Sequence, residues 1–210
     1  TAIVSNETLT NWIEALLAQR SVVLAITVTV PALPLHRAAF GRALASGADP
    51  ALLAQVLALP GENYLAEQME VVDVDGIHAA RLFIMRTLAE RLRGSLRATY
   101  QTLHVRDREG YRIDSAAIGR RALKNTCLDY LMQLDDAETR ALCLEQFHSA
   151  STMTDQLGAL VPLANCDGPE RAAALAAFYA RWRHEPLVVD KWLTLQATSR
   201  LPGTLGVVRE

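Results

Sequence analysis

The feature that most constrains the fold is a residue pattern that occurs twice, at a constant offset of about 35 residues. In each copy an aromatic residue ends one helix, a polar or proline-containing break follows, and an acidic residue lies in the first turn of a new apolar helix. A period of this length is typical of arrays of helix pairs, because one pair cannot bury its own apolar face. Two ordinary helical hairpins would give the same pattern, so both interpretations stay open. The matched positions are Phe147 and Trp182, Met153 and Val188, Asp155 and Asp190, Leu157 and Trp192, and Leu160 and Leu195.

The rest of the chain also has helical periodicity, interrupted by prolines, glycines and capping residues, which include Asp49, Asp114 and Asp136. The longest predicted helix, 77–103, carries an apolar stripe on one face and arginines on the other, and a polar loop is expected over 105–110. The helix that follows carries Ile118, Leu123 and Cys127 on its apolar face. Residues Ser21–Val30 are β-branched, but no partner strand is evident, and we expect this segment to continue the first helix. The expected helices are 6–20, 35–46, 50–59, 62–69, 77–103, 115–134, 137–149, 154–163, 169–182 and 186–195. The predicted fold is therefore all-α: an array of about nine to ten antiparallel helices with superhelical, helix-repeat character, in a single domain spanning 1–210.

Four motifs, in this order along the chain, resemble the C-terminal helical domain of bacterial aminopeptidase N, a zinc metallo-aminopeptidase. They are Leu59–Glu67 (LPGENYLAE), Ala122–Leu128 (ALKNTCL), Met153–Asp155 (MTD) and Asp190–Ala197 (DKWLTLQA). One position departs from the family pattern, because Thr152 stands where the family usually has Asn. Both side chains cap helices, so we expect the fold to be unchanged there.

The resemblance implies that 1–210 is a truncated piece of the C-terminal domain of a larger enzyme. The catalytic domain would precede Thr1, and further helices of the same domain would follow Glu210. The parent would remove N-terminal residues from peptides, and this domain would cap the active-site cavity and limit entry to small peptides. The expected partners are the rest of the parent polypeptide and, in the parent, peptides. Bare apolar faces on the isolated piece would then favour self-association.

The chain lacks the motif that this zinc chemistry needs. A peptidase of this type has His-Glu-x-x-His on a helix, which points two imidazoles at one metal and uses the Glu as base. No two of the five histidines have that spacing: they are His36, His78, His104, His148 and His184. We expect no catalytic, cofactor-binding or metal-binding residue in this chain, and zinc only in the parent.

Nucleophilic catalysis has little support. Cys127 or Cys143 paired with His148 stays open from sequence, but a small buried cysteine on an apolar helix is far more common than a nucleophile. The odd number of cysteines, with Cys166 as the third, and the absence of Cys-x-x-Cys favour a reducing, cytoplasmic location over a disulfide framework or a thiolate zinc site.

Three further sets of residues have both a functional and a structural interpretation. Asp155 and Asp190 resemble an acid/base pair, but an acid in the first turn of a helix is better explained by the helix dipole, with Lys191 as a partner for one of them. The aromatic residues that could stack on a ligand are better explained as core residues: Trp12, Trp182 and Trp192. The arginines of 77–103 form a basic patch or, more simply, a solvated helix face: Arg81, Arg86, Arg93 and Arg97.

The overall charge excludes some classes of partner. The formal net charge is −2 and the pI is about 6.2, so no electrostatic argument supports nucleic acid or an anionic membrane as a partner. The apolar part of Ser21–Val30 is too short to span a bilayer. A second function class stays open, a free-standing helical-repeat scaffold that binds a protein partner on a concave face.

Overall fold

The computed structural model describes residues 33–107 and 112–209. Within these ranges the chain forms ten helices and no strand. The helices are α3 (Leu33–Ala45), α4 (Pro50–Val56), α5 (Glu62–Ala66), α6 (Val74–Asp107), α7 (Ser115–Met132), α8 (Ala137–Ser149), α9 (Met153–Leu163), α10 (Pro169–Trp182), α11 (Pro186–Ala197) and α12 (Thr204–Arg209). The predictions for 6–20 and 21–30, Trp12 included, lie outside the described residues.

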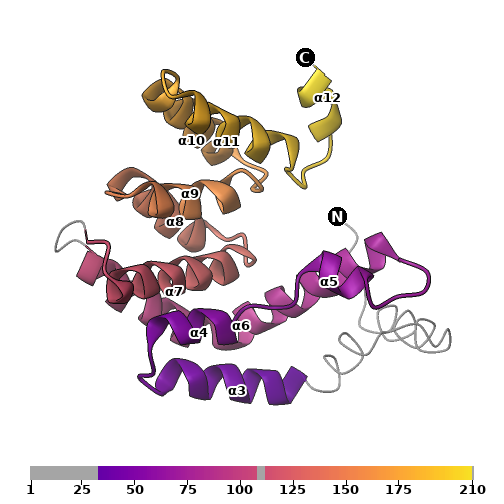
Figure 1. The fold of residues 1–210 in the computed structure, drawn as a ribbon, viewed down its shortest axis with the longest axis vertical. Helices are drawn as coiled ribbons and strands as arrows, with labels where there is room; N and C mark the ends of the chain where they lie inside the picture. The colour runs from indigo at the N-terminus through magenta and orange to yellow at the C-terminus, as the bar shows by residue number, and fades with distance from the viewer. Residues whose placement is uncertain (1–32, 108–111, 210) are drawn as a thin grey trace.

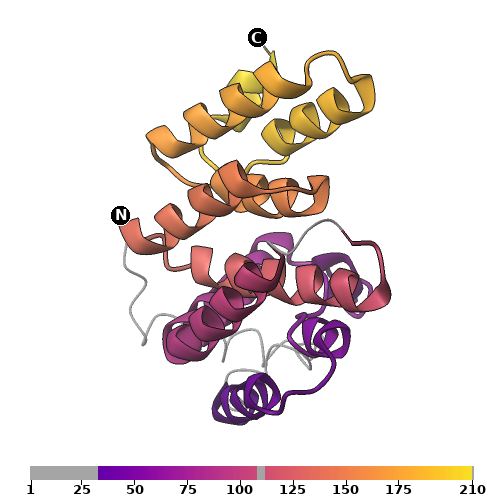
Figure 2. The ribbon, with the colours of Figure 1, turned by 90° about the vertical axis from the view of Figure 1, so that its left-hand side faces the viewer.

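The helices are stacked in successive layers, as Figure 1 shows from α3 at one end to α10 and α11 at the other. Figure 2 shows the same stack after a quarter turn. Helix α7 contacts α4, α6, α8 and α9, so it joins the two halves of the stack, and α10 packs on both α8 and α9. The predicted all-α array with repeat character is confirmed.

Four of the predicted cap residues begin their helices as the sequence indicates. The side chain of Asp49 accepts hydrogen bonds at the start of α4, and Asp114 and Asp136 do the same for α7 and α8. Thr152, the departure from the family pattern, caps α9 by accepting from the backbone N–H of Asp155 at 3.1 Å. These side chains satisfy backbone donors that have no partner within the helix, which fixes where each helix starts.

The apolar stripe predicted for 77–103 lies in the core along its whole length. All eight of its residues are buried: Ile77, Ala80, Ile84, Leu88, Leu92, Leu96, Tyr100 and Leu103. On α7, Ile118 was predicted to belong to the buried stripe, and this is wrong, because its side chain is 54% exposed. It lies in the first turn of the helix, while the face carried by Leu123 and Cys127 turns inward.

Several boundaries differ from the predictions by a few residues. The helix expected over 50–59 ends at Val56, and α7 ends at Met132 rather than at 134. Helix α6 continues to Asp107, into what the sequence indicates as a polar loop from Val105. The starts of these helices match the predictions more closely than their ends do, and helix ends commonly fray.

The arginine face of α6 is only partly a solvated face. Arg93 Nη1 lies 2.7 Å from Asp136 Oδ2, and its Nη2 lies 2.6 Å from Glu138 Oε2. Arg97 forms an ion pair with the same Glu138. Arg86 pairs within its own helix. Two of the four arginines therefore tie α6 to the start of α8 and do not form a free basic patch.

Candidate functional site

The three cysteines within the described residues lie in the core. Cys127, Cys143 and Cys166 are free and buried. Burial raises the pKa of Cys127 to about 12 and that of Cys166 to about 11, and it raises the pKa of Cys143 further. The Cys143 thiol donates to the carbonyl oxygen of Ala159 at 3.2 Å, whereas His148 is exposed. A thiol in this state is not the thiolate that nucleophilic catalysis needs, and the core interpretation of the cysteines is confirmed.

The two aspartates of the repeat lie in different surroundings. Asp155 is in the first turn of α9, as predicted, and is buried. Asp190 is exposed and lies beyond the first turn of α11, because that helix already begins at Pro186. The two carboxylates are therefore not equivalent, and the first-turn prediction is correct only for Asp155.

Lys191 was expected to pair with one of these two aspartates, but it is not the partner of Asp155. Lys124 of α7 is the partner: its Nζ lies 3.0 Å from Asp155 Oδ2, with side-chain exposures of 2% and 4%. Lys191 lies on an exposed part of α11. A cation beside a buried carboxylate offsets the cost of desolvating both charges, which the helix dipole alone cannot do.

Around this pair lies a polar cluster, which we define as Lys124, Asn125, Gln146 and Asp155, and all of these except the partly exposed Asn125 are buried. Asn125 Nδ2 donates to Asp155 Oδ1 at 3.3 Å. Gln146 Nε2 donates to Asn125 Oδ1 at 2.8 Å and to the backbone oxygen of Asp155 at 2.9 Å. Two of the motifs that carry the family resemblance, ALKNTCL and MTD, therefore meet in one cluster that joins α7, α8 and α9.

The tryptophans within the described residues act in packing. Trp182 Nε1 donates to Gln156 Oε1, and Trp192 Nε1 donates to the backbone oxygen of Leu175, both at 2.9 Å. The ring of Trp192 packs against that of Tyr179, with centroids 4.7 Å apart and ring planes tilted by 36°. The prediction that Trp192 is buried is only half right, because both indoles are partly exposed. Each indole closes a contact between neighbouring helices.

Histidine side chains are not gathered in the described part of the chain. His148 and His184 are exposed near helix ends. His78 Nδ1 lies 2.8 Å from Glu62 Oε1 and joins α5 to α6. His104 stacks on Tyr100, and the side chain of His36 lies outside the described residues. Among the described residues no three His, Cys, Asp or Glu side chains come together to hold a metal ion.

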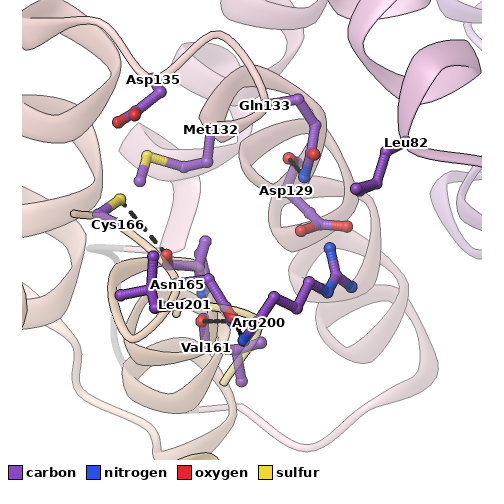
Figure 3. A pocket seen from close by; sticks show the side chains of 11 residues that line it. Leu82, Asp129, Met132, Gln133, Asp135, Val161, Asn165, Cys166, Arg200 and Leu201 are labelled. Carbon is purple, nitrogen blue, oxygen red and sulfur yellow. Dashed lines mark hydrogen bonds between the residues drawn. The ribbon is translucent and has the colours of Figure 1, made fainter. Parts of the chain in front are cut away.

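A cavity of about 290 Å³ lies where α6, α7, the C-terminal end of α9 and the α11–α12 loop meet. Figure 3 shows polar and apolar side chains around it. Sequence reasoning did not single out this place, because its walls come from segments far apart in the chain. Its lining residues include Asp129, Gln133, Asn165, Arg200, Met132 and Val161.

No helix in the described parts of the chain is long and apolar enough to cross a membrane.

Comparison with known proteins finds three aminopeptidases N among the relatives of this chain. Aminopeptidase N of Caulobacter vibrioides is 39% identical over 168 residues, covering 80% of this chain and 19% of the relative. Aminopeptidase N of Escherichia coli is 37% identical over 84% of this chain, and that of Haemophilus influenzae is 33% identical over 77%. The chain spans about a fifth of the length of these relatives, from 18% to 20%.

A solved structure has the same fold. The aminopeptidase A of Legionella pneumophila, determined in complex with aspartic acid, superposes with a TM-score of 0.71 over 82% of this chain and 21% of that chain, at 24% identity. The resemblance to the C-terminal helical domain of bacterial aminopeptidase N is confirmed by the relatives. Residues 11–210 match the sequence profile described as "Domain of unknown function (DUF3458_C) ARM repeats", and the chain belongs to this family.

Proposed function

We propose that this chain is the non-catalytic helical domain of a zinc-dependent aminopeptidase of the aminopeptidase N type, a polypeptide that removes N-terminal residues from peptides. The main support is the 33–39% identity to three aminopeptidases N over most of this chain but only about a fifth of theirs. Residues 1–210 then form one domain of a longer chain. No group of three His, Cys, Asp or Glu side chains in the described residues could hold a metal ion, and in this proposal the catalytic zinc lies in another part of that polypeptide.

The proposed role of the domain is to cap the active-site cavity and to restrict access to small peptides. A wall with this role must hold its shape. Three features of the fold support rigidity: a core that continues through the stack, the buried Lys124–Asp155 pair between α7 and α9, and the ion pairs of Arg93 between α6 and α8. Helices fixed to one another in this way resist the opening that would admit a folded protein.

The surface of α11 and α12 suggests where the rest of the polypeptide packs. Helix α11 is rich in apolar residues, yet none of its residues is buried, whereas α9 buries Ala159, Leu160 and Leu163. The exposed apolar residues here are Leu187 at 78%, Leu193 at 52%, Leu205 at 63% and Val208 at 54%. Repeat arrays bury such faces against a neighbouring element. We propose that the catalytic domain or further helices cover this surface, and that the isolated chain self-associates or binds a hydrophobic dye through it.

We also place the parent in the cytoplasm. The three cysteines are free in the structure, which fits a reducing compartment.

A chimeric enzyme tests whether this domain restricts access to the active site. The matching segment of Caulobacter vibrioides aminopeptidase N is exchanged for the corresponding residues of this chain, and kcat/KM is measured for an aminoacyl chromogenic substrate and for a folded protein with a free N-terminus. We expect the chimera to hydrolyse the first and to exclude the second. A chimera without any hydrolysis, or one that processes the folded protein, would contradict the proposal.

A variant of the chimera distinguishes an effect on substrate size selection from an effect on the catalytic reaction. Lys124→Ala removes the cation of the buried pair and should loosen the contact between α7 and α9. We expect increased cleavage of bulky peptides with little change for the chromogenic substrate. The matched control is Arg86→Gln, because Arg86 pairs with Glu90 on an exposed face. Unchanged size selection in the Lys124→Ala chimera, despite a lower melting temperature, would count against the wall.

A further inference from the structure

The cavity beside α7 is lined in part by polar side chains from three segments of the chain. On one side α7 supplies Asp129, Met132 and Gln133, and on the other the end of α9 supplies Val161 and Asn165. Arg200 and Leu201 close it from the loop between α11 and α12. Figure 3 shows the carboxylate of Asp129 and the guanidinium of Arg200 directed toward each other across this hollow.

The loop that carries Arg200 is held in place by the end of α9. Ser199 Oγ donates to the backbone oxygen of Ala164 at 3.0 Å and is buried. The backbone N–H of Arg200 donates to Asn165 Oδ1 at 2.8 Å. The backbone of Arg200 is therefore fixed, while its side chain is exposed and able to meet a ligand.

Asp129 and Arg200 face each other without closing an ion pair. Within the described part of the chain, neither side chain has an ion-pair partner within 4.0 Å. Asp129 is open to solvent, so a small molecule can reach it. The surrounding protein displaces part of its hydration, which raises the pKa of its carboxyl, while Arg200 and Arg81 act in the opposite direction. A reachable, partly desolvated carboxylate opposite a guanidinium is typical of ligand sites.

We propose that this cavity binds a small α-amino acid zwitterion, with the ammonium group on Asp129 and the carboxylate on Arg200. In such a ligand the two charges are joined through one carbon, so it can fit between two protein charges that do not reach each other. An anion without an ammonium group would face the Asp129 carboxylate, and a cation without a carboxylate would face Arg200. The complementarity therefore selects the zwitterion over either half of it.

The apolar part of the remaining wall favours an apolar side chain on the ligand, while Gln133, Asp135, Asn165 and Cys166 make the rest of it polar. Met132, Val161 and Leu201 line the cavity beside the charged pair, with Leu82 and Pro162. The volume of about 290 Å³ lies just below the roughly 300–1,000 Å³ of small-molecule sites, which suits a single amino acid. The site goes beyond the proposed function and does not depend on it, because none of its residues is assigned to the wall or to peptide cleavage.

Calorimetric titration of the full chain with three related ligands tests the site. The ligands are leucine, leucinamide, which lacks the carboxylate, and N-acetylleucine, which lacks the ammonium group. We expect saturable binding of leucine and binding of each analogue that is weaker by at least about 10-fold. Wild-type protein that shows no saturable binding of leucine, or that binds an analogue as tightly as leucine, overturns the proposal.

Two substitutions locate the binding. Asp129→Asn and Arg200→Gln should each weaken leucine binding by at least about 10-fold, and the controls Asp190→Asn and Arg86→Gln should not change it. All four side chains are exposed, so the variants should keep the helical circular dichroism and the melting temperature of the parent chain. Leucine binding that is unchanged in both cavity variants would place the ligand elsewhere and overturn the assignment.

Discussion

Lys124 Nζ lies 3.0 Å from Asp155 Oδ2, and this buried pair joins the middle of α7 to the first turn of α9. Each residue comes from a different motif of the family resemblance. Removal of one partner leaves an uncompensated charge in the core, which costs far more than the pair contributes. The pair is therefore sensitive to single substitutions and tolerant of a matched double substitution.

We expect Lys124→Met and Asp155→Leu each to lower the free energy of unfolding by about 3–5 kcal/mol, because each leaves its partner charged and buried. The double variant should lose less than the sum of the two, since no buried charge is left. Urea denaturation of the four proteins measures this coupling. A loss below about 1 kcal/mol for either single variant would mean that the pair is solvated. The control, Arg86→Gln, should change stability by less than about 1 kcal/mol.

Gly119 marks a close approach of α7 to α4. A Cβ at this position would lie 2.9 Å from the backbone nitrogen of Ala51, and that backbone cannot move aside as a flexible side chain can. We expect Gly119→Ala to destabilise the protein by about 1–3 kcal/mol.

Gly94 on α6 is the matched control for Gly119. A Cβ there meets nothing within 4 Å. Gly94→Ala should stabilise the protein by about 0.5–1 kcal/mol through helix propensity. Thermal melts should show a lower melting temperature for Gly119→Ala and a higher one for Gly94→Ala than for the parent chain. A stabilised Gly119→Ala protein would contradict the close packing of α4 on α7.

Trp192 combines packing with a hydrogen bond. Its ring packs against that of Tyr179, and its Nε1 donates to the backbone oxygen of Leu175. Because the side chain is only partly buried, Trp192→Ala should cost about 2–3 kcal/mol, less than the 3–5 kcal/mol of a fully buried tryptophan. Trp192→Phe keeps a ring and should cost about 1 kcal/mol, the worth of one hydrogen bond. If denaturant titrations gave equal losses of unfolding free energy for Trp192→Ala and Trp192→Phe, the ring packing would not contribute separately from the hydrogen bond, which would contradict this prediction.

Stability should fall in acid through two helix caps. The backbone N–H of Ala117 holds the pKa of Asp114 below its ordinary value. Burial pushes the pKa of Asp136 up, but the hydrogen bonds from Thr139 and Arg93 outweigh it, so that pKa is also lowered. An acid with a lowered folded-state pKa stabilises the fold above its unfolded-state pKa of about 4 and loses this contribution as the pH falls further.

The test of the caps is an acid titration. The variant Asp114→Asn/Asp136→Asn keeps capping side chains but cannot titrate. Its free energy of unfolding should therefore fall less steeply than that of the parent chain between about pH 5 and pH 2. Identical slopes would show that these carboxyls do not contribute to acid denaturation.

Much of the fold follows from local sequence. The caps Asp114, Asp136 and Thr152 satisfy backbone donors of their own helices, so their positions can be read without knowing the neighbours. The stripe from Ile77 to Leu103 is likewise a property of one helix, and all of it is buried. Local chemistry of this kind predicted the order of the helices and most of their starts.

The candidate sites depend on contacts that no single helix contains. The ion-pair partner of Asp155 is Lys124 rather than Lys191, because the packing of α7 against α9 brings Lys124 and Asp155 together. Arg93, which was expected on a solvated face, forms ion pairs with Asp136 and Glu138 at the start of α8, because α8 lies next to α6 at this point. The cavity between Asp129 and Arg200 forms only when the α11–α12 loop lies against α9. Sequence periodicity has no information on these distances.

The proposal of a non-catalytic domain is tested most directly by metal content and hydrolysis of the purified 210-residue chain. Zinc is measured by elemental analysis, and activity is measured with an aminoacyl chromogenic substrate. We predict no stoichiometric zinc and no turnover. One zinc per chain, together with hydrolysis that a chelator abolishes and added zinc restores, would contradict the account.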